Sequence, residues 1–404
     1  MQKISAFSSQ VFLVFGLLGV LFIPFTFRYI PFQESITHFL FEDFLVFIAS
    51  KFEGIYIANP EVSSDSTTLY LLFGVLFIIA LLVVIGLSFF SFWQKHRKKV
   101  QLVIRLVLTY YLSLILLKYG FDKVFKAQFY LPEPNILYTP MGMLDKDILF
   151  WSTMGVSRSY NIFMGCIEII PALLLLHSRT RILGLFILFG VLLNVVFINL
   201  GFDISVKLFS LFLLFLTIIL LAPSISRIIR FLTVQKSAHL ERFTGAQLIP
   251  SKVIRRSLKG VVLLFFAAEA LFPYIQTGHY NDDLTPRNYL HGAYEVMEIS
   301  SDKEGQNLPE IKRIFIHRQN YFIMQFSDDT MEDFKLKIDP SQKELILTTY
   351  DEETIVFQYD YNEAQKELSL LSKSLGWNIV TKELDWQKLP ALQPLFHWTV
   401  DGVE

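Results

Sequence analysis

Apolar runs of about twenty residues recur along the first two thirds of this 404-residue chain. A run of that length can cross the hydrocarbon core of a bilayer as one α-helix. The pattern therefore predicts an α-helical polytopic membrane bundle with about seven spans. The predicted spans are residues 11–27, 69–92, 100–119, 160–176, 182–200, 204–222 and 260–275.

The segments beside these spans are less regular. Residues 31–66 mix aromatic and acidic side chains, which favours an amphipathic segment lying at the membrane interface. The stretch 63–68 (SSDSTT) suits a helix start, because Ser and Asp side chains accept hydrogen bonds from free N–H groups there. The last span is short and contains Glu269 and Pro273, so the predicted topology depends on whether it crosses.

From Ala293 onward the apolar period changes from that of a helix to two residues, which is typical of β-strands. Short strands separated by turn residues predict an antiparallel meander that closes into a small β-barrel or sandwich. Such a barrel could hold an apolar ligand, as lipocalins do, or form a packed cap. Trp377, Trp386 and Trp398 are expected to fill its core. The predicted strands are residues 294–299, 313–316, 321–326, 334–338, 344–350, 354–359 and 367–371.

Charge divides the chain in the same way. Residues 1–275 carry 24 basic and 14 acidic side chains, and residues 276–404 carry 12 basic and 23 acidic ones. Basic loops mark the cytoplasmic side of membrane proteins, so seven spans predict a cytoplasmic N-terminus and an external C-terminal domain. The predicted domains are an N-terminal anchor at 1–99, a four-helix core at 100–222, a basic connection with the last span at 223–275, and a lipocalin-like β-domain at 276–404.

Polar residues inside the four-helix core are the strongest candidates for function. An ionisable group at bilayer depth costs roughly 2.5–3.5 kcal/mol on insertion scales unless it is paired or hydrated. The topology brings these groups to the outer half of one bundle, where they could line a pocket that opens outward. Equally, Glu168 could pair with Lys118 or Lys207 and simply hold helices together. The candidate ligand-binding residues are Lys118, Lys123, Glu168, Asn194, Asn199, Asp203 and Lys207.

The sequence lacks the residues that several classes of chemistry require. Cys166 is the single cysteine, so the chain cannot form an internal disulfide or supply a cysteine pair for an iron–sulfur cluster. The eight histidines lie outside the predicted membrane interior, which argues against a haem held by two histidines. No zinc-protease, P-loop or nucleophile-elbow motif occurs, and no basic patch suggests nucleic acid. Neither a metal nor a haem is therefore expected.

Residues 100–222 resemble the DoxX family of four-helix bacterial membrane proteins, and in particular a branch with an appended C-terminal β-domain. The positions that carry this resemblance are Tyr119-Gly120, Lys123, Gln128-Phe129, Trp151, Met154-Gly155, Ser157, Tyr160, Gly165, Glu168, Arg179-Thr180, Asn194-Val195-Val196, Asn199, Asp203, Val206-Lys207-Leu208, Ala222-Pro223 and Phe396-His397-Trp398. The resemblance implies a protein of the bacterial inner membrane, and its β-domain would then be periplasmic. Members of the family include membrane partners of redox enzymes.

Three functional hypotheses follow. The first is a DoxX-type subunit that binds a quinone or a small anion in the polar pocket, beside a redox enzyme partner and within the lipid bilayer. The second is a non-catalytic envelope protein that binds lipid or scaffolds an assembly, with the β-domain as its recognition element. The third, by analogy of fold alone, is a lipid-handling enzyme like the membrane relatives of vitamin K-dependent carboxylase, with Lys207 as a base. Whether the protein is an enzyme is left open.

Overall fold

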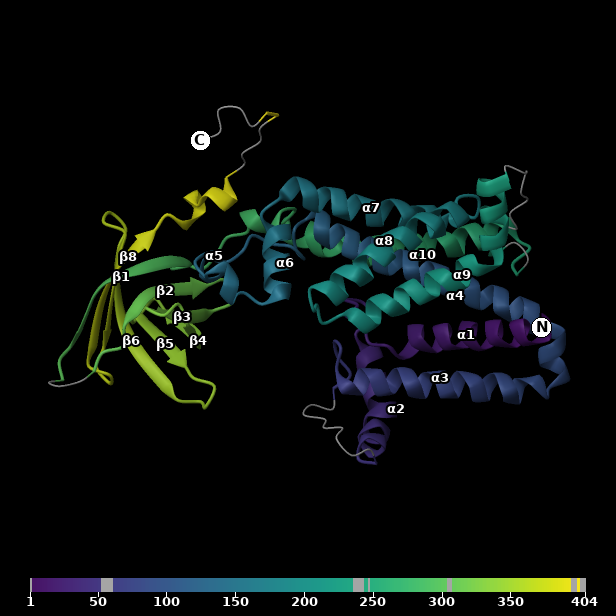
Figure 1. The fold of residues 1–404 in the computed structure, drawn as a ribbon, viewed down its shortest axis with the longest axis horizontal. Coiled ribbons are helices and arrows are strands. Elements are labelled where there is room, and N and C mark those ends of the chain that lie inside the picture. The colour runs from purple at the N-terminus through teal and green to yellow at the C-terminus, as the bar shows by residue number, and fades with distance from the viewer. Residues whose placement is uncertain are drawn as a thin grey trace. The chain divides into compact units, whose positions relative to one another are not determined.

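The computed structural model describes residues 2–51, 61–234, 243–245, 248–303, 307–393 and 398–399. The chain forms two compact units (Figure 1). The helical unit comprises Met1–Gln128 and Ser159–Asn281, and the barrel unit comprises Phe129–Arg158 and Asp282–Glu404. Part of the basic connection, at 235–242, and Phe396 and His397 of the tail lie outside the described residues.

The helical unit confirms the prediction of a helical membrane part. Its helices are α1 (Gln2–Phe22), α2 (Phe32–Ala49), α3 (Thr67–Ser88), α4 (Ser91–Val124), α7 (Arg158–Leu176), α8 (Arg181–Gly201), α9 (Lys207–Val234) and α10 (Lys252–Thr277). Within the described residues, six of them are long and apolar enough to cross a membrane, namely α3, α4 and α7 to α10. In α1 the apolar stretch is shorter, Phe7–Phe22.

Helix ends differ from the predicted ones for identifiable reasons. The first helix stops at Phe22 instead of residue 27, because Pro24 disfavours the helical conformation at the residue before it. The basic residues 95–99, predicted as a loop, form part of α4, since Lys and Arg are good helix formers. Ser66 caps α3 as expected, and its side chain accepts a hydrogen bond from the Leu69 N–H at 3.2 Å.

Aromatic side chains form much of the contact among α1, α3 and α9. Phe15 of α1 meets Phe73 and Phe77 of α3 and Phe212 and Phe215 of α9 in edge-to-face contacts. This arrangement is favourable because the positive ring edge faces the negative ring face. Several of the 40 phenylalanines of the chain thus pack helix against helix.

The barrel unit contains a closed antiparallel barrel in which each strand pairs with the next and β1 pairs with β8. The sequence predicted seven strands, and the structure adds β8. Its strands are β1 (Gly292–Ser301), β2 (Ile311–His317), β3 (Tyr321–Phe326), β4 (Met331–Asp339), β5 (Glu344–Thr348), β6 (Thr354–Asn362), β7 (Glu367–Ser372) and β8 (Trp377–Leu384).

Large apolar side chains fill the interior of the barrel. Phe322 and Phe357, both fully buried, stack there with ring centroids 6.2 Å apart. The buried Tyr294 hydroxyl donates a hydrogen bond to the Leu290 carbonyl at 2.8 Å. Of the three tryptophans expected in this core, Trp377 packs against it, but Trp398 is 91% exposed. The interior of the barrel is a packed core in the described residues.

A second apolar cluster covers the outside of β1 to β3. Phe315 and Ile323 lie there with Trp386, and Leu131 and Tyr138 pack against them. The covering segment includes α5 (Pro134–Leu137), and α6 (Lys146–Gly155) follows it. Residues 129–158, predicted within the membrane domain at 100–222, therefore belong to the barrel unit, because their apolar side chains complete its outer face.

Candidate functional site

A buried ion pair joins two of the seven predicted site residues. Lys123, near the end of α4, donates a hydrogen bond to Glu168 of α7 at 2.8 Å. The two residues are 6% and 2% exposed. The Lys123 ammonium also lies over the Tyr119 ring, 5.4 Å from its centroid. Glu168 thus pairs with Lys123, and not with Lys118 or Lys207, the partners weighed from the sequence.

Two glycines bring the helices of this pair together. A Cβ atom on Gly165 of α7 would lie 2.5 Å from the Gly120 carbonyl oxygen of α4, closer than real contacts allow. Further along the same two helices, the Ser113 hydroxyl donates to the Ala172 carbonyl at 2.8 Å. Small residues at a crossing point and polar bonds between helices are the usual means of association in a bilayer. The pair therefore lies beside a close helix contact.

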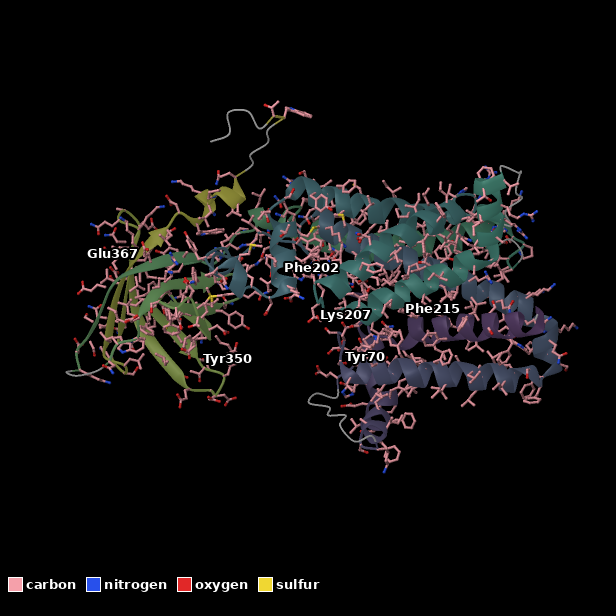
Figure 2. The ribbon with its side chains drawn as sticks, viewed as in Figure 1. Tyr70, Phe202, Lys207, Phe215, Tyr350 and Glu367 are labelled. Atoms are coloured by element: carbon pink, nitrogen blue, oxygen red, sulfur yellow. The ribbon has the colours of Figure 1, made fainter. Side chains whose placement is uncertain are left out.

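Lys207 and Asp203 belong to a different group of contacts. Lys207 begins α9 (Figure 2), and its ammonium lies 2.7 Å from Asp203 and 3.5 Å from Asp65. Asp65 also accepts the backbone N–H groups of Lys207 and Leu208, each at 2.9 Å. Asp65 therefore accepts the free N–H groups at the start of α9, although the sequence suggested it only as part of the cap of α3, the helix that follows it in the chain.

The remaining predicted residues do not join either group in the described contacts. Lys118 lies 4.0 Å from Asp122, one turn further along α4, and Asp122 accepts a hydrogen bond from Tyr274 of α10 at 2.5 Å. On α8, Asn199 is buried whereas Asn194 is exposed. The structure thus distributes the seven residues over several places in the helical unit. That they bind a ligand stays a prediction.

Glu269 is a polar residue of α10 whose role the sequence did not reveal. Its carboxylate is fully buried and accepts the backbone N–H groups of Arg28 at 2.6 Å and Tyr29 at 3.1 Å. The Arg28 side chain in turn donates to Gln276 at 2.7 Å. In the sequence, a charged residue weakened the case for a membrane span at 260–275. In the structure, the Glu269 carboxylate accepts hydrogen bonds from backbone N–H groups of the segment that follows α1. Its partners lie about 240 residues away in the sequence, so no local pattern could indicate them.

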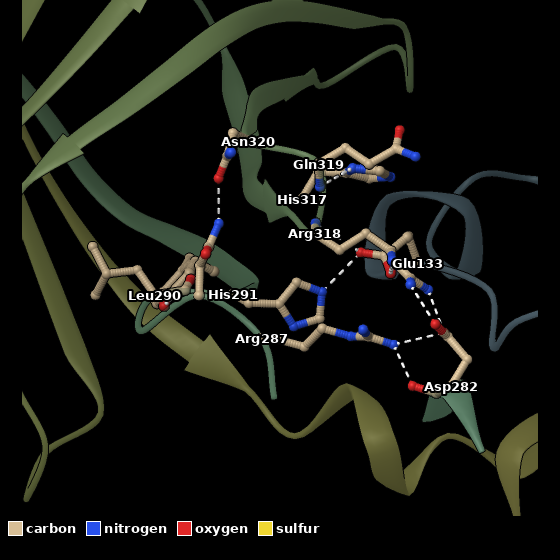
Figure 3. Close-up of polar contacts among 11 residues, drawn as sticks. Glu133, Asp282, Arg287, Leu290, His291, His317, Arg318, Gln319 and Asn320 are labelled. Atoms are coloured by element: carbon tan, nitrogen blue, oxygen red, sulfur yellow. Dashed lines mark hydrogen bonds and ion pairs between the residues drawn. The ribbon is translucent and has the colours of Figure 1, made fainter. Parts of the chain in front are cut away.

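The barrel unit holds a polar cluster that the sequence analysis missed (Figure 3). Arg318 donates two hydrogen bonds to Asp282, at 2.7 and 2.8 Å, and its guanidinium lies over the Tyr130 ring at 4.4 Å. Glu133 accepts hydrogen bonds from the His291 ring at 2.7 Å and from the Arg318 backbone N–H at 3.2 Å. These contacts attach the segment that starts at Phe129 to the β2–β3 turn and to the residues before β1.

Electrostatics in this cluster favour charged carboxylates. Burial alone would raise the pKa of Glu133, but the hydrogen bond and charge of His291 outweigh it, so the pKa lies below its ordinary value. Burial likewise opposes the charge of Asp282, yet its bonds to Arg318 and Arg287 lower the pKa. Burial and the nearby His291 and Arg318 lower the pKa of His317. Paired in this way, the cluster is suited to hold elements together.

No group of three or more His, Cys, Asp or Glu side chains suited to a metal occurs in the described residues. The hydroxyl of Tyr111, in the middle of α4, is buried and has no hydrogen-bond partner among the described residues. It is a polar atom that a ligand or a water molecule could satisfy.

Comparison with known proteins identifies one relative. A 128-residue stretch, 31% of this chain, is 35% identical to the uncharacterized protein YwoB of Bacillus subtilis (strain 168), and it covers 80% of that protein. The chain belongs to the family of YwoB. No protein-family model matches it, and no solved structure matches it either. Because YwoB is itself uncharacterized, membership of its family indicates no reaction or ligand for this chain.

Proposed function

We propose that this protein is a non-catalytic membrane protein of the bacterial envelope that scaffolds an assembly, with the helical unit as its anchor and the barrel as its recognition element. The observation that carries the proposal is the closed Lys123–Glu168 pair, whose charges satisfy each other at 2.8 Å. The backbone-capping carboxylates of Asp65 and Glu269 support it, because they too act on the protein itself. The filled barrel interior favours a barrel that binds through its outer surface.

The proposed topology has seven crossings, with a cytoplasmic N-terminus and a periplasmic barrel in the inner membrane. Residues 129–158 and the strands form one compact unit, so both must lie on one side of the membrane. Four helices, α7 to α10, separate them, and an even number of crossings meets this condition only if α10 also spans. The basic residues 95–99 support the orientation.

Thiol labelling tests the topology. In a Cys166→Ser background, a membrane-impermeant maleimide should label Gln342→Cys in spheroplasts and should label Lys98→Cys only after lysis. Both positions are exposed, so access to them is limited only by the membrane. Labelling of Lys98→Cys in intact spheroplasts would contradict the proposed orientation.

A specific observation favours the second candidate, a DoxX-type subunit that binds a quinone or a small anion beside a redox enzyme. The buried Tyr111 hydroxyl, without a partner among the described residues, could donate a hydrogen bond to a quinone carbonyl. An unsatisfied buried hydroxyl costs roughly 1–3 kcal/mol on mutational scales, so a ligand that accepts from it would gain affinity. Tyr111 lies on α4, the helix that also carries Lys118 and Lys123.

One preparation distinguishes the two candidates. The protein is purified gently, its lipid extract is analysed by mass spectrometry, and its optical spectrum and native mass are recorded. The scaffold proposal predicts bulk phospholipid, no chromophore, and a native species larger than the 46.9 kDa protomer. A quinone at one copy per chain that is lost in Tyr111→Phe, but kept in the exposed control Tyr70→Phe, would overturn it in favour of the redox subunit.

A further inference from the structure

A pocket of about 300 Å³ lies on the outer wall of the barrel, beside α5. The side chains of β2, β3 and β4 that form it point away from the packed interior. This volume is at the lower end of those of small-molecule sites. It suits one compact group at the end of a longer ligand. Its lining includes Asn135, His317, Tyr321, Met331 and Asp333.

Two hydrogen-bond acceptors of this lining are the oxygens of Asn135 and Asp333. The Asn135 side-chain oxygen is buried and receives no hydrogen bond from the described residues. One oxygen of Asp333 accepts from the Tyr350 hydroxyl at 2.5 Å, which fixes the carboxylate and leaves its second oxygen available to a ligand. Two acceptors, one of them charged, call for a ligand that donates several hydrogen bonds and carries positive charge.

The other walls accept a cation as well. Tyr321 presents an aromatic ring, whose face attracts ammonium and guanidinium groups. The ring of His317 stands edge-to-face to it, with centroids 6.0 Å apart, and its Nδ1 accepts the Gln319 N–H at 3.1 Å. Burial lowers the pKa of His317, so its ring is neutral at pH 7 and does not repel a cation. Residues 276–404 are acidic overall, with 12 basic and 23 acidic side chains, which attracts cations to the domain.

We propose that this outer-wall pocket binds a primary ammonium or guanidinium group, donated either by a basic side chain of a partner protein or by a free polyamine. The inference rests on the proposed role of the barrel as the recognition element, and it names the chemistry of what is recognised. The Asp333 and Asn135 oxygens accept hydrogen bonds from the N–H groups of the cation, and the Tyr321 ring packs over the cation.

Titration calorimetry on the full-length protein in detergent tests the proposal. The probes are spermidine and a peptide of three lysines with blocked ends, with an acetylated-lysine peptide as the uncharged control. Saturable binding of either cationic probe is expected, and Asp333→Asn should weaken it about tenfold or more, because charge-assisted hydrogen bonds are roughly twice as strong as neutral ones. Spermidine binding alone would indicate a polyamine, and peptide binding a protein partner.

Matched variants separate a site from general attraction. Glu332→Gln removes the same charge from the next residue of β4, on the other face of the strand, and should leave the affinity within twofold. Lys335→Gln removes a cation paired across the strands with Tyr321 and should strengthen binding. Equal losses in Asp333→Asn and Glu332→Gln, or no saturable binding of any probe, would overturn the proposal. The scaffold role is tested separately, by the native mass and the lipid content of the purified protein, so failure of the pocket proposal leaves that test unaffected.

Discussion

At the scale of residues, carboxylates in the helical unit bind backbone N–H groups as well as side chains. Asp65 accepts two N–H groups at the start of α9, and Glu269 accepts two where the chain leaves α1. A carboxylate that receives such bonds keeps its charge at a much lower cost than an isolated one. These acids are therefore better understood as caps within the membrane part than as reactive groups.

Asp65→Ala should lower the stability of the helical unit by about 0.5–2 kcal/mol, the usual cost of losing a helix cap. Asp203→Asn, which removes the other charged partner of Lys207, should cost about 0–1 kcal/mol because Asp203 is 80% exposed and water screens the pair. Asn is chosen because the backbone at Asp203 is left-handed, with a φ of 55°, which Asn tolerates and Ala does not. Thermal unfolding of both variants in the same detergent makes the comparison. A larger loss for Asp203→Asn would contradict the assignment of Asp65 as a cap.

The sequence indicated which residues matter more reliably than it indicated their partners. Glu168 and Lys123 stood out because charge is rare in apolar spans, and both proved to be buried. The pairing itself was not predicted: the sequence favoured Lys118 or Lys207 as the partner of Glu168, because the helix rotations that bring Lys123 to it cannot be read from the sequence. The contacts from Asp65 to Lys207 and from Glu269 to Arg28 cross 142 and 241 residues, beyond any local pattern.

At the scale of elements, close approach of α4 and α7 positions the buried pair. The contact depends on the absence of side chains at Gly120 and Gly165, since either Cβ atom would collide with the facing helix. The sequence showed both glycines but could not show that they face each other.

Gly165→Val should therefore destabilise the helical unit by about 1–3 kcal/mol through overpacking. Its Cβ would lie 2.5 Å from the Gly120 oxygen and 2.6 Å from the Val124 side chain. Gly190→Ala in α8 is the matched control, because nothing lies within 4 Å of its added atom, and Ala favours a helix over Gly. Unfolding in detergent should thus show a loss of stability for Gly165→Val and a gain for Gly190→Ala. Equal effects would refute the close contact between α4 and α7 at Gly165.

Acid should loosen the segment at 129–138 from the barrel. The lowered pKa of Glu133 means that its charge contributes stability above its ordinary pKa of 4.5, and this contribution is lost as pH falls below that value. His317, whose pKa is also lowered, adds a loss of the same sign that begins below 6.5. The melting temperature should therefore fall between pH 7 and pH 4.

The variant Glu133→Gln isolates the first of these contributions. It should be less stable than the wild type at pH 7, and it should lose less stability than the wild type between pH 5 and pH 4. Glu332→Gln, exposed on the same unit, serves as the charge control. Wild type and Glu133→Gln with the same dependence on pH would refute the assigned role of Glu133.

At the scale of the whole molecule, the apolar pattern predicted both architectures and most of their elements. Helical spans and alternating strands have different periods, so the change near residue 293 was visible without a structure. The barrel's last strand was missed because the polar residues Thr381 and Glu383 continue the face of Trp377 and Ile379, which breaks its apolar alternation. The place of residues 129–158 was also missed, since a loop between two spans carries no pattern that assigns it to a distant sheet.

The central claim is that the charges of the membrane part tie helices together. A double-mutant cycle on Lys123→Met and Glu168→Met, read as unfolding free energy in detergent, tests it most directly. The account predicts that each single variant loses about 3–5 kcal/mol, because one charge stays buried without its partner, and that the double variant recovers most of this loss. Single variants as stable as the wild type, with no coupling between them, would contradict the account and return the pair to the list of ligand-binding candidates.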